Sequence, residues 1–172
     1  MIYTSLFRGR ELTLLPALPE DCAELIICDY KNIKEGSSFN PGLLWQNYKR
    51  LLKDYGAIVI VAPKSIAKAI HKRSDIPNIY SVNTKTETLY IYSQSASPAP
   101  HIDGQQLKSR KALYSQLIEH FTIPYDFVLA VPMGDGEAGV VCTELQRNFV
   151  GIENRPTAFN KAYVKINMAN EK

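Results

Sequence analysis

One stretch near the carboxyl end of the chain, residues 126–162, constrains the fold more than any other part of the sequence. It reads DFVLAVPMGDGEAGVVCTELQRNFVGIENRPTAFNKA, in which two apolar runs enclose a glycine pair and a helical pattern. The run from Phe127 to Val131 is typical of a buried parallel strand. Gly134 and Gly136 predict a tight turn in which the backbone can approach a ligand closely. This order of strand, glycine turn, helix and strand predicts one unit of a doubly wound α/β sheet.

Carboxylates flank the glycine turn on both sides. Asp135 and Glu137 stand where the helix should begin, a position where the helix dipole favours anions. Glu153 ends the second strand, and a carboxylate at that point of a doubly wound sheet can hold ribose hydroxyls. A Gly-x-Gly pair is weak evidence by itself, because an ordinary strand-to-helix turn has the same pattern.

The surrounding residues make the pattern specific. Without gaps, the stretch resembles the first motif of the N6-adenine and N4-cytosine DNA methyltransferases, which use S-adenosylmethionine as methyl donor. The matching positions are Asp126, Val128, Leu129, Met133, Gly134, Gly136, Gly139, Glu144, Leu145, Arg147 to Glu153, Phe159 and Ala162. The resemblance implies that the cofactor would be bound by Cys28, Pro132, Met133, Gly134, Asp135, Gly136, Glu153 and Asn154.

An earlier segment resembles the catalytic motif of the same family, which reads Asp-Pro-Pro-Tyr. The apolar run from Leu25 to Cys28 ends in Asp29 and Tyr30, and Leu18-Pro19 with an acidic stretch precedes it. Because this motif comes before the cofactor motif, the resemblance is to the circularly permuted beta class. It covers most of the chain in one collinear order.

The resemblance makes Asp29 and Tyr30 the candidate catalytic residues. In the family, the Asp side chain and the next carbonyl accept hydrogen bonds from the exocyclic amine of the base, while an aromatic ring stacks on the flipped base. Two registers are open in this chain. In one, Tyr30 and Lys31 replace the prolines and Asn32 replaces the aromatic residue; in the other, the loop is two residues shorter and Tyr30 is the stacking residue.

Several positions depart from the family pattern. Both catalytic prolines are absent, residues 130–132 read Ala-Val-Pro in place of Asp-Pro-Phe, and Ser109-Arg110 replaces Lys-Pro. Residues 93–106 are also too few for a target-recognition insert that would read bases.

Three interpretations therefore stay open. The first is a DNA amino-methyltransferase, specific for adenine-N6 or cytosine-N4, with relaxed motifs. The second is an inactive pseudo-methyltransferase that acts as a DNA- or protein-binding module, for example in phage or restriction-modification biology. The third is a different enzyme that uses another nucleotide-like ligand on the same scaffold.

The alternation of strand and helix patterns predicts one domain over residues 1–172 with a Rossmann-like methyltransferase fold. We expect a mostly parallel sheet, an antiparallel hairpin at its edge and helices on both faces. The expected strands are 2–7, 24–29, 57–62, 78–83, 88–93, 127–131 and 149–152. The expected helices are 42–54, 64–72, 107–121, 137–147 and 156–168.

Composition is compatible with this interpretation. A net charge of +3 permits contact with DNA, the expected partner, alongside a homodimer or a partner methyltransferase or restriction subunit. No apolar run is long enough to span a membrane. The three cysteines lack paired ligand spacing and the histidines are scattered, so we expect reduced thiols, no metal site and a cytoplasmic location.

Overall fold

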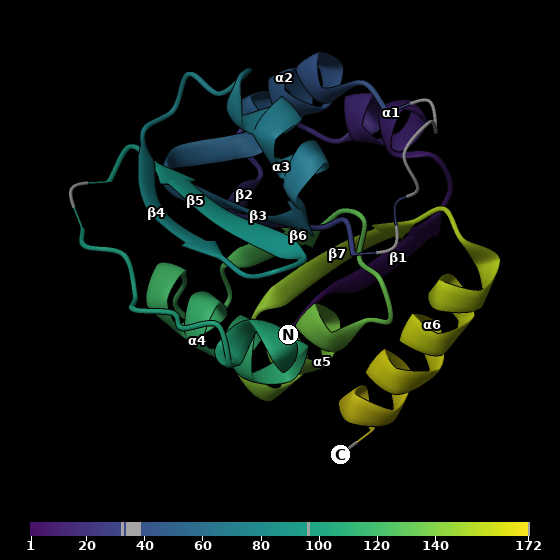
Figure 1. Ribbon diagram of the computed structural model, residues 1–172. Coiled ribbons are helices and arrows are strands. Elements are labelled where there is room, and N and C mark those ends of the chain that lie inside the picture. The colour runs from purple at the N-terminus through teal and green to yellow at the C-terminus, as the bar shows by residue number, and fades with distance from the viewer. Residues whose placement is uncertain (32, 34–38, 96, 172) are drawn as a thin grey trace.

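A computed structural model describes residues 1–31, 33, 39–95 and 97–171 of the chain (Figure 1). Within these ranges, seven strands form one sheet in the order β1-β7-β6-β2-β3-β5-β4. The strands are β1 (Thr4–Arg8), β2 (Ala23–Asp29), β3 (Leu52–Pro63), β4 (Asn78–Asn83), β5 (Glu87–Ser93), β6 (Phe127–Ala130) and β7 (Asn148–Glu153). All neighbours are parallel except β5, which runs antiparallel to both β3 and β4.

Helices cover both faces of this sheet. They are α1 (Glu11–Leu14), α2 (Pro41–Leu51), α3 (Lys64–His71), α4 (Arg110–Phe121), α5 (Glu137–Glu144) and α6 (Pro156–Asn170), with 3-10 turns at Leu15–Ala17 and Gln106–Lys108. Figure 1 shows α1, α2 and α3 on one face and α4, α5 and α6 on the other. The predicted Rossmann-like α/β fold, with its antiparallel hairpin at the edge, is confirmed.

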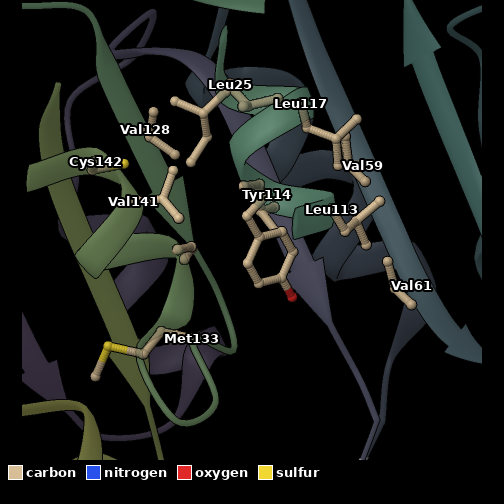
Figure 2. Close-up of a cluster of buried hydrophobic side chains, with 14 of the residues drawn as sticks. Leu25, Val59, Val61, Leu113, Tyr114, Leu117, Val128, Met133, Val141 and Cys142 are labelled. Atoms are coloured by element: carbon tan, nitrogen blue, oxygen red, sulfur yellow. The ribbon is translucent and has the colours of Figure 1, made fainter. Parts of the chain in front are cut away.

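The central strands are buried on both faces, as their continuous apolar sequences require. Successive side chains of a strand point to opposite faces, so Leu25 and Ile26 enter two different core layers. One layer contacts α2 and α3, and the other contacts α4, α5 and α6. Figure 2 shows part of the second layer, where Tyr114 and Leu117 of α4 lie close to residues of the sheet. Both faces therefore have a hydrophobic core, which fixes the sheet between the helices.

Several boundaries differ from the sequence prediction: for example, the helix expected at 107–121 begins at Arg110, and the helix expected at 137–147 ends at Glu144. The helix expected at 42–54 ends at Leu51, and Leu52 already belongs to β3 because it pairs with Ala23 of β2. The one-turn helix α1 was not expected, because four residues are too few for a helical periodicity to be recognised. At Leu52, pairing with another strand therefore decides the local structure.

Neither a membrane-spanning helix nor a cluster of metal-binding side chains is present in the described ranges. None of the helices in these ranges is long and apolar enough to cross a bilayer. In the same ranges, no group of three or more His, Cys, Asp or Glu side chains is arranged to hold a metal ion.

Candidate ligand site at the carboxyl ends of the strands

Strands β6 and β2 are neighbours in the middle of the sheet, and the chain leaves them towards opposite faces. After β6 it continues to α5, and after β2 it continues to α2 on the other face (Figure 1). Ligands of open α/β sheets bind at such a switch point, outside the carboxyl ends of the strands. A cavity of about 510 Å³ lies there. It is lined by Arg10, Glu11, Leu12, Thr13, Asp29, Tyr30, Ile33, Phe39, Asn40, Leu44, Pro132, Glu153, Asn154 and Arg155.

The structure brings half of the predicted site residues to this cavity. Those that line it are Asp29, Tyr30, Pro132, Glu153 and Asn154. The other predicted residues lie outside the lining: Cys28 and Met133 are buried in the two core layers, Gly136 is buried, Gly134 is half-buried and Asp135 is exposed. The cofactor-binding and catalytic roles of all these residues stay predictions.

The carboxylate of Asp29 is surrounded by donors from the protein itself. Its Oδ2 accepts a hydrogen bond from Arg110 Nε at 2.7 Å and another from the hydroxyl of Tyr114. Its Oδ1 accepts from the backbone N–H of Lys31 at 3.1 Å and, more weakly, from Arg110 Nη2 at 3.4 Å. Two carboxylate oxygens offer about four lone-pair sites. Asp29 therefore has no acceptor site left in this arrangement.

Arg110 is held in place by further contacts. Its Nη2 donates to Glu87 Oε1 at 2.7 Å, and its Nη1 donates to the carbonyl of Leu107. The side chains of Arg110 and Asp29 are 11% and 12% exposed, so this ion pair is largely removed from water. Burial by itself lowers the pKa of Arg110, but the charge of Asp29 and the hydrogen bonds to Asp29 and Glu87 outweigh it and raise that pKa. The guanidinium is therefore a fixed cation beside Asp29.

Tyr114 supplies the second strong donor to Asp29. Its ring lies in the core layer between the sheet and α4, and Figure 2 shows the hydroxyl at the end of the ring that points away from Leu25 and Leu117. Burial, followed by the negative charge of Asp29, raises the pKa of Tyr114 well above its ordinary value. The hydroxyl therefore keeps its proton and donates a hydrogen bond to Oδ2 of Asp29.

Glu153, the predicted ribose ligand, is saturated in the same way. Its side chain is 1% exposed. Its Oε1 accepts from the backbone N–H and the Nε of Arg155 at 2.9 and 3.0 Å. Its Oε2 accepts from the backbone N–H of Gly134 at 3.0 Å and from Arg155 Nη2 at 3.2 Å. Asp29 and Glu153 thus each have an arginine partner and accept four hydrogen bonds.

Tyr30 lies in the core rather than at an open surface. It has no exposed area, its hydroxyl is hydrogen-bonded to that of Tyr48, and its ring meets Phe39 edge-on with centroids 5.5 Å apart. Stacking on a flipped base, as the second register requires, would need an accessible ring face that Tyr30 does not have here. Asn32, the aromatic replacement in the first register, lies outside the described residues.

Glu11 is a cavity residue that the sequence did not indicate. It begins the unexpected helix α1 and lies among Glu153 and Tyr30 at the carboxyl ends of the strands. Burial and the nearby charge of Glu153 raise the pKa of Glu11 to about 7, although a hydrogen bond from Tyr30 lowers it in part. Only the folding of β1 and β7 side by side brings these two carboxyl groups together.

The raised pKa of Glu11 predicts that the protein loses stability as the pH rises from about 5 to 8. Between the ordinary pKa of 4.5 and about 7, the unfolded chain releases the Glu11 proton while the folded chain retains it. Glu11→Gln has no proton to lose, so its Tm should rise relative to wild type across this range. Thermal melts at several pH values measure the difference. Glu119→Gln, which changes an exposed residue of α4, should show the same dependence of Tm on pH as wild type. If the Tm of Glu11→Gln also changes with pH as that of wild type does, the prediction is contradicted.

Comparison with solved structures places this architecture among known folds. TTHA0409 of Thermus thermophilus, a candidate DNA modification methylase, is 16% identical, and the match covers 97% of this chain and 96% of that one with a TM-score of 0.77. M1.HpyAVI is 23% identical, with 95% and 99% covered and a TM-score of 0.66. The cytosine-N4-specific PvuII DNA methyltransferase is 16% identical, with 98% and 92% covered and a TM-score of 0.65.

This chain also matches the structures of two of these proteins solved with a bound cofactor. The complexes of TTHA0409 and M1.HpyAVI with S-adenosylmethionine match with TM-scores of 0.75 and 0.68. No protein-family model matches this sequence, and no curated protein is significantly similar to it. Since the identities are low and the matches span nearly whole chains, the likeness is one of fold. The chain therefore has the fold of the DNA modification methylases along almost its entire length.

Proposed function

We propose that this protein is a pseudo-methyltransferase, a DNA-binding module that has kept the methyltransferase fold without methyl transfer. The observation that carries this proposal is the saturated carboxylate of Asp29, the residue at the family's catalytic position. All of its acceptor sites are taken by Arg110, Tyr114 and the Lys31 backbone. An amine of a base finds no free acceptor there.

Displacement of these donors by a base would be unfavourable. The pair between Arg110 and Asp29 is largely buried, and breaking a buried pair typically costs about 3–5 kcal/mol because one charge stays uncompensated. An amino group of a base is neutral and offers weaker hydrogen bonds than a guanidinium. Arg110 would also repel a sulfonium placed close to Asp29. The internal pair therefore outcompetes a substrate amine.

The residues present do not fit S-adenosylmethionine in the family's manner. The lone pairs of Glu153 that would accept ribose hydroxyls are occupied by Gly134 and Arg155. The position that carries an acid beside the cofactor in the family is Ala130, which is buried in the core. We therefore propose that cofactor binding has been lost together with catalysis.

DNA is the partner that this proposal favours. The proteins that share the fold are named as DNA methylases, and the chain carries a net charge of +3. A second copy of the chain, a partner methyltransferase or a restriction subunit would be compatible with the same role. A phage or restriction-modification setting, and a cytoplasmic location, belong to the same proposal.

Two assays test the loss of activity. Calorimetric titration with S-adenosylmethionine should give no binding heat up to millimolar ligand, for wild type and for Glu153→Ala alike. Incubation of the protein with radiolabelled S-adenosylmethionine and unmethylated duplex DNA should give no labelled DNA, while an active adenine-N6 methyltransferase labels the same DNA. Methyl transfer that disappears in Asp29→Ala would refute the proposal.

A further inference from the structure

The exposed side of α3 and the turn after it carry four lysine or arginine side chains and one imidazole in close sequence. We call the α3 surface the set of five exposed residues Lys64, Lys68, His71, Lys72 and Arg73. Between Tyr55 and Thr86 the sequence contains a single acidic residue, Asp75. Within the described ranges, no ion pair is formed by the lysines and the arginine of this surface. Their charges are therefore available to an external anion.

The helix presents these cations from a fixed orientation. Lys64, Lys68 and Lys72 follow each other at intervals of four residues, which places them along one side of the helix about 6 Å apart. The opposite side of α3 carries Ile66 and Ile70, which are buried in the core layer against the sheet. Because its apolar side packs against the sheet, α3 keeps its charged side towards solvent.

Neighbouring contacts hold the end of this surface in place. The ring of His71 is stacked on Tyr90, with centroids 4.5 Å apart and planes 7° apart, and its Nδ1 lies 2.9 Å from the hydroxyl of Tyr92. Asp75 does not neutralise the surface, because it binds Lys49 and accepts a hydrogen bond from Trp45 at 2.9 Å. The hydrogen bond from Lys49, and after it the one from Trp45, lowers the pKa of Asp75, so the carboxylate stays ionised beside Lys49.

We propose that the α3 surface binds the phosphate backbone of duplex DNA without reading base sequence. This inference rests on the proposed function and deepens it, since it names where DNA would be held. Closely spaced lysines and arginines that lack acidic neighbours supply the charge that phosphate contacts need. None of the five residues lines the cavity beside Asp29, so DNA would be held without inserting a base there.

The same geometry argues against a lipid surface. A helix that lies on a membrane inserts an apolar side between the headgroups. In α3 that side faces the sheet, with Ile66 at 7% and Ile70 at 0% exposed. An acidic protein partner remains an alternative occupant, and the experiment distinguishes it from DNA.

The experiment measures binding of a fluorescent duplex of about 25 base pairs by anisotropy, between about 50 and 200 mM salt. The first variant combines Lys64→Gln, Lys68→Gln and Lys72→Gln, all exposed side chains whose replacement should leave the fold intact. The matched control combines Lys85→Gln, Lys108→Gln and Lys161→Gln, which removes the same charge from exposed positions outside the α3 surface. Thermal melts establish that both variants are folded.

The α3 variant should bind about 10- to 100-fold more weakly at about 50 mM salt, and its slope of log K against log salt should fall by about 2 to 3. The control should lose less than about threefold. Equal losses in both variants would mean that overall charge attracts the DNA, and no loss in either would place the site elsewhere. Either result, or no binding of DNA by wild type, would overturn the inference.

A competition separates DNA from an acidic partner. Polyglutamate at equal charge should displace the duplex poorly, and equal displacement would overturn the assignment to nucleic acid. The proposed loss of catalysis is judged independently by the labelled methyl assay. If the α3 variant binds DNA as the control does, the α3 assignment fails but the methyl assay still judges catalysis. If the protein transfers methyl groups, the proposed loss of catalysis fails but the anisotropy data still show where DNA binds.

Discussion

Replacing Arg110 by methionine should lower the free energy of unfolding by about 3–5 kcal/mol, because Asp29 would remain buried without its counter-charge. The side chains of both residues are little exposed, and Arg110 makes its hydrogen bonds to Asp29 at 2.7 and 3.4 Å. Methionine keeps most of the volume of arginine, so the loss reports charge and hydrogen bonding rather than a cavity. Urea denaturation followed by circular dichroism measures it.

A double-mutant cycle assigns the effect to the pair. Asp29→Asn in the Arg110→Met background should recover part of the lost stability, since a neutral amide needs no counter-ion. Glu87→Gln, which removes the other carboxylate bound to Arg110, should cost only about 1 kcal/mol because Asp29 still holds the guanidinium. A loss below about 1 kcal/mol in Arg110→Met would show that the pair is loose and that Asp29 is available to a substrate.

This result also bears on the proposed function. A catalytic carboxylate is kept ready for its substrate, so its neutralisation often leaves stability unchanged or increases it. Here Asp29→Asn alone should destabilise the protein, because Arg110 and Tyr114 would both lose their ionic acceptor. Destabilisation by Asp29→Asn would thus support a structural role for the residue that the sequence resemblance makes the catalytic candidate.

Gly136→Ala should destabilise the protein by about 2–4 kcal/mol, and Gly134→Ala by only about 1 kcal/mol. A Cβ at Gly136 would lie 2.7 Å from the Cα of Ala162 in α6, so α5 and α6 would have to separate. The backbone there also has φ +86°, which adds strain for alanine. At Gly134 the φ of +60° carries a similar strain, but a Cβ meets no atom within 4 Å.

The two glycine variants form a matched pair, and urea denaturation of both measures their difference. A close approach of helix α6 keeps Gly136 as glycine, whereas Gly134 has open space beside it. Equal destabilisation of the two variants would show that backbone strain alone matters and that the contact with Ala162 relaxes. The contact with α6 thus gives Gly136 a structural reason to be glycine that does not depend on a bound ligand.

The sequence determined the architecture of this protein because its signals are local. The apolar runs ending at Asp29 and Ala62 specify buried strands, and the helical pattern between the glycine turn and Phe149 specifies a crossover helix. Right-handed parallel crossovers then allow few topologies. The collinear family resemblance rested on these same residues, and the solved structures confirm its fold.

Only the tertiary structure decided the chemistry of the site, because its partners are far apart in sequence. Arg110 lies 81 residues from Asp29 in the sequence. The replacement of the family's Lys-Pro by Ser109-Arg110 was visible in the sequence, but nothing there indicated that Arg110 would pair with Asp29. Glu11 meets Glu153 only where β1 pairs with β7. The spacing of apolar residues predicts which face of a helix or strand is buried. Whether a carboxylate has all its acceptor sites occupied depends instead on side chains that come together only when the chain folds. The sequence therefore singled out Asp29 and Glu153, and the folded chain shows that both line one cavity and that each is paired with an arginine.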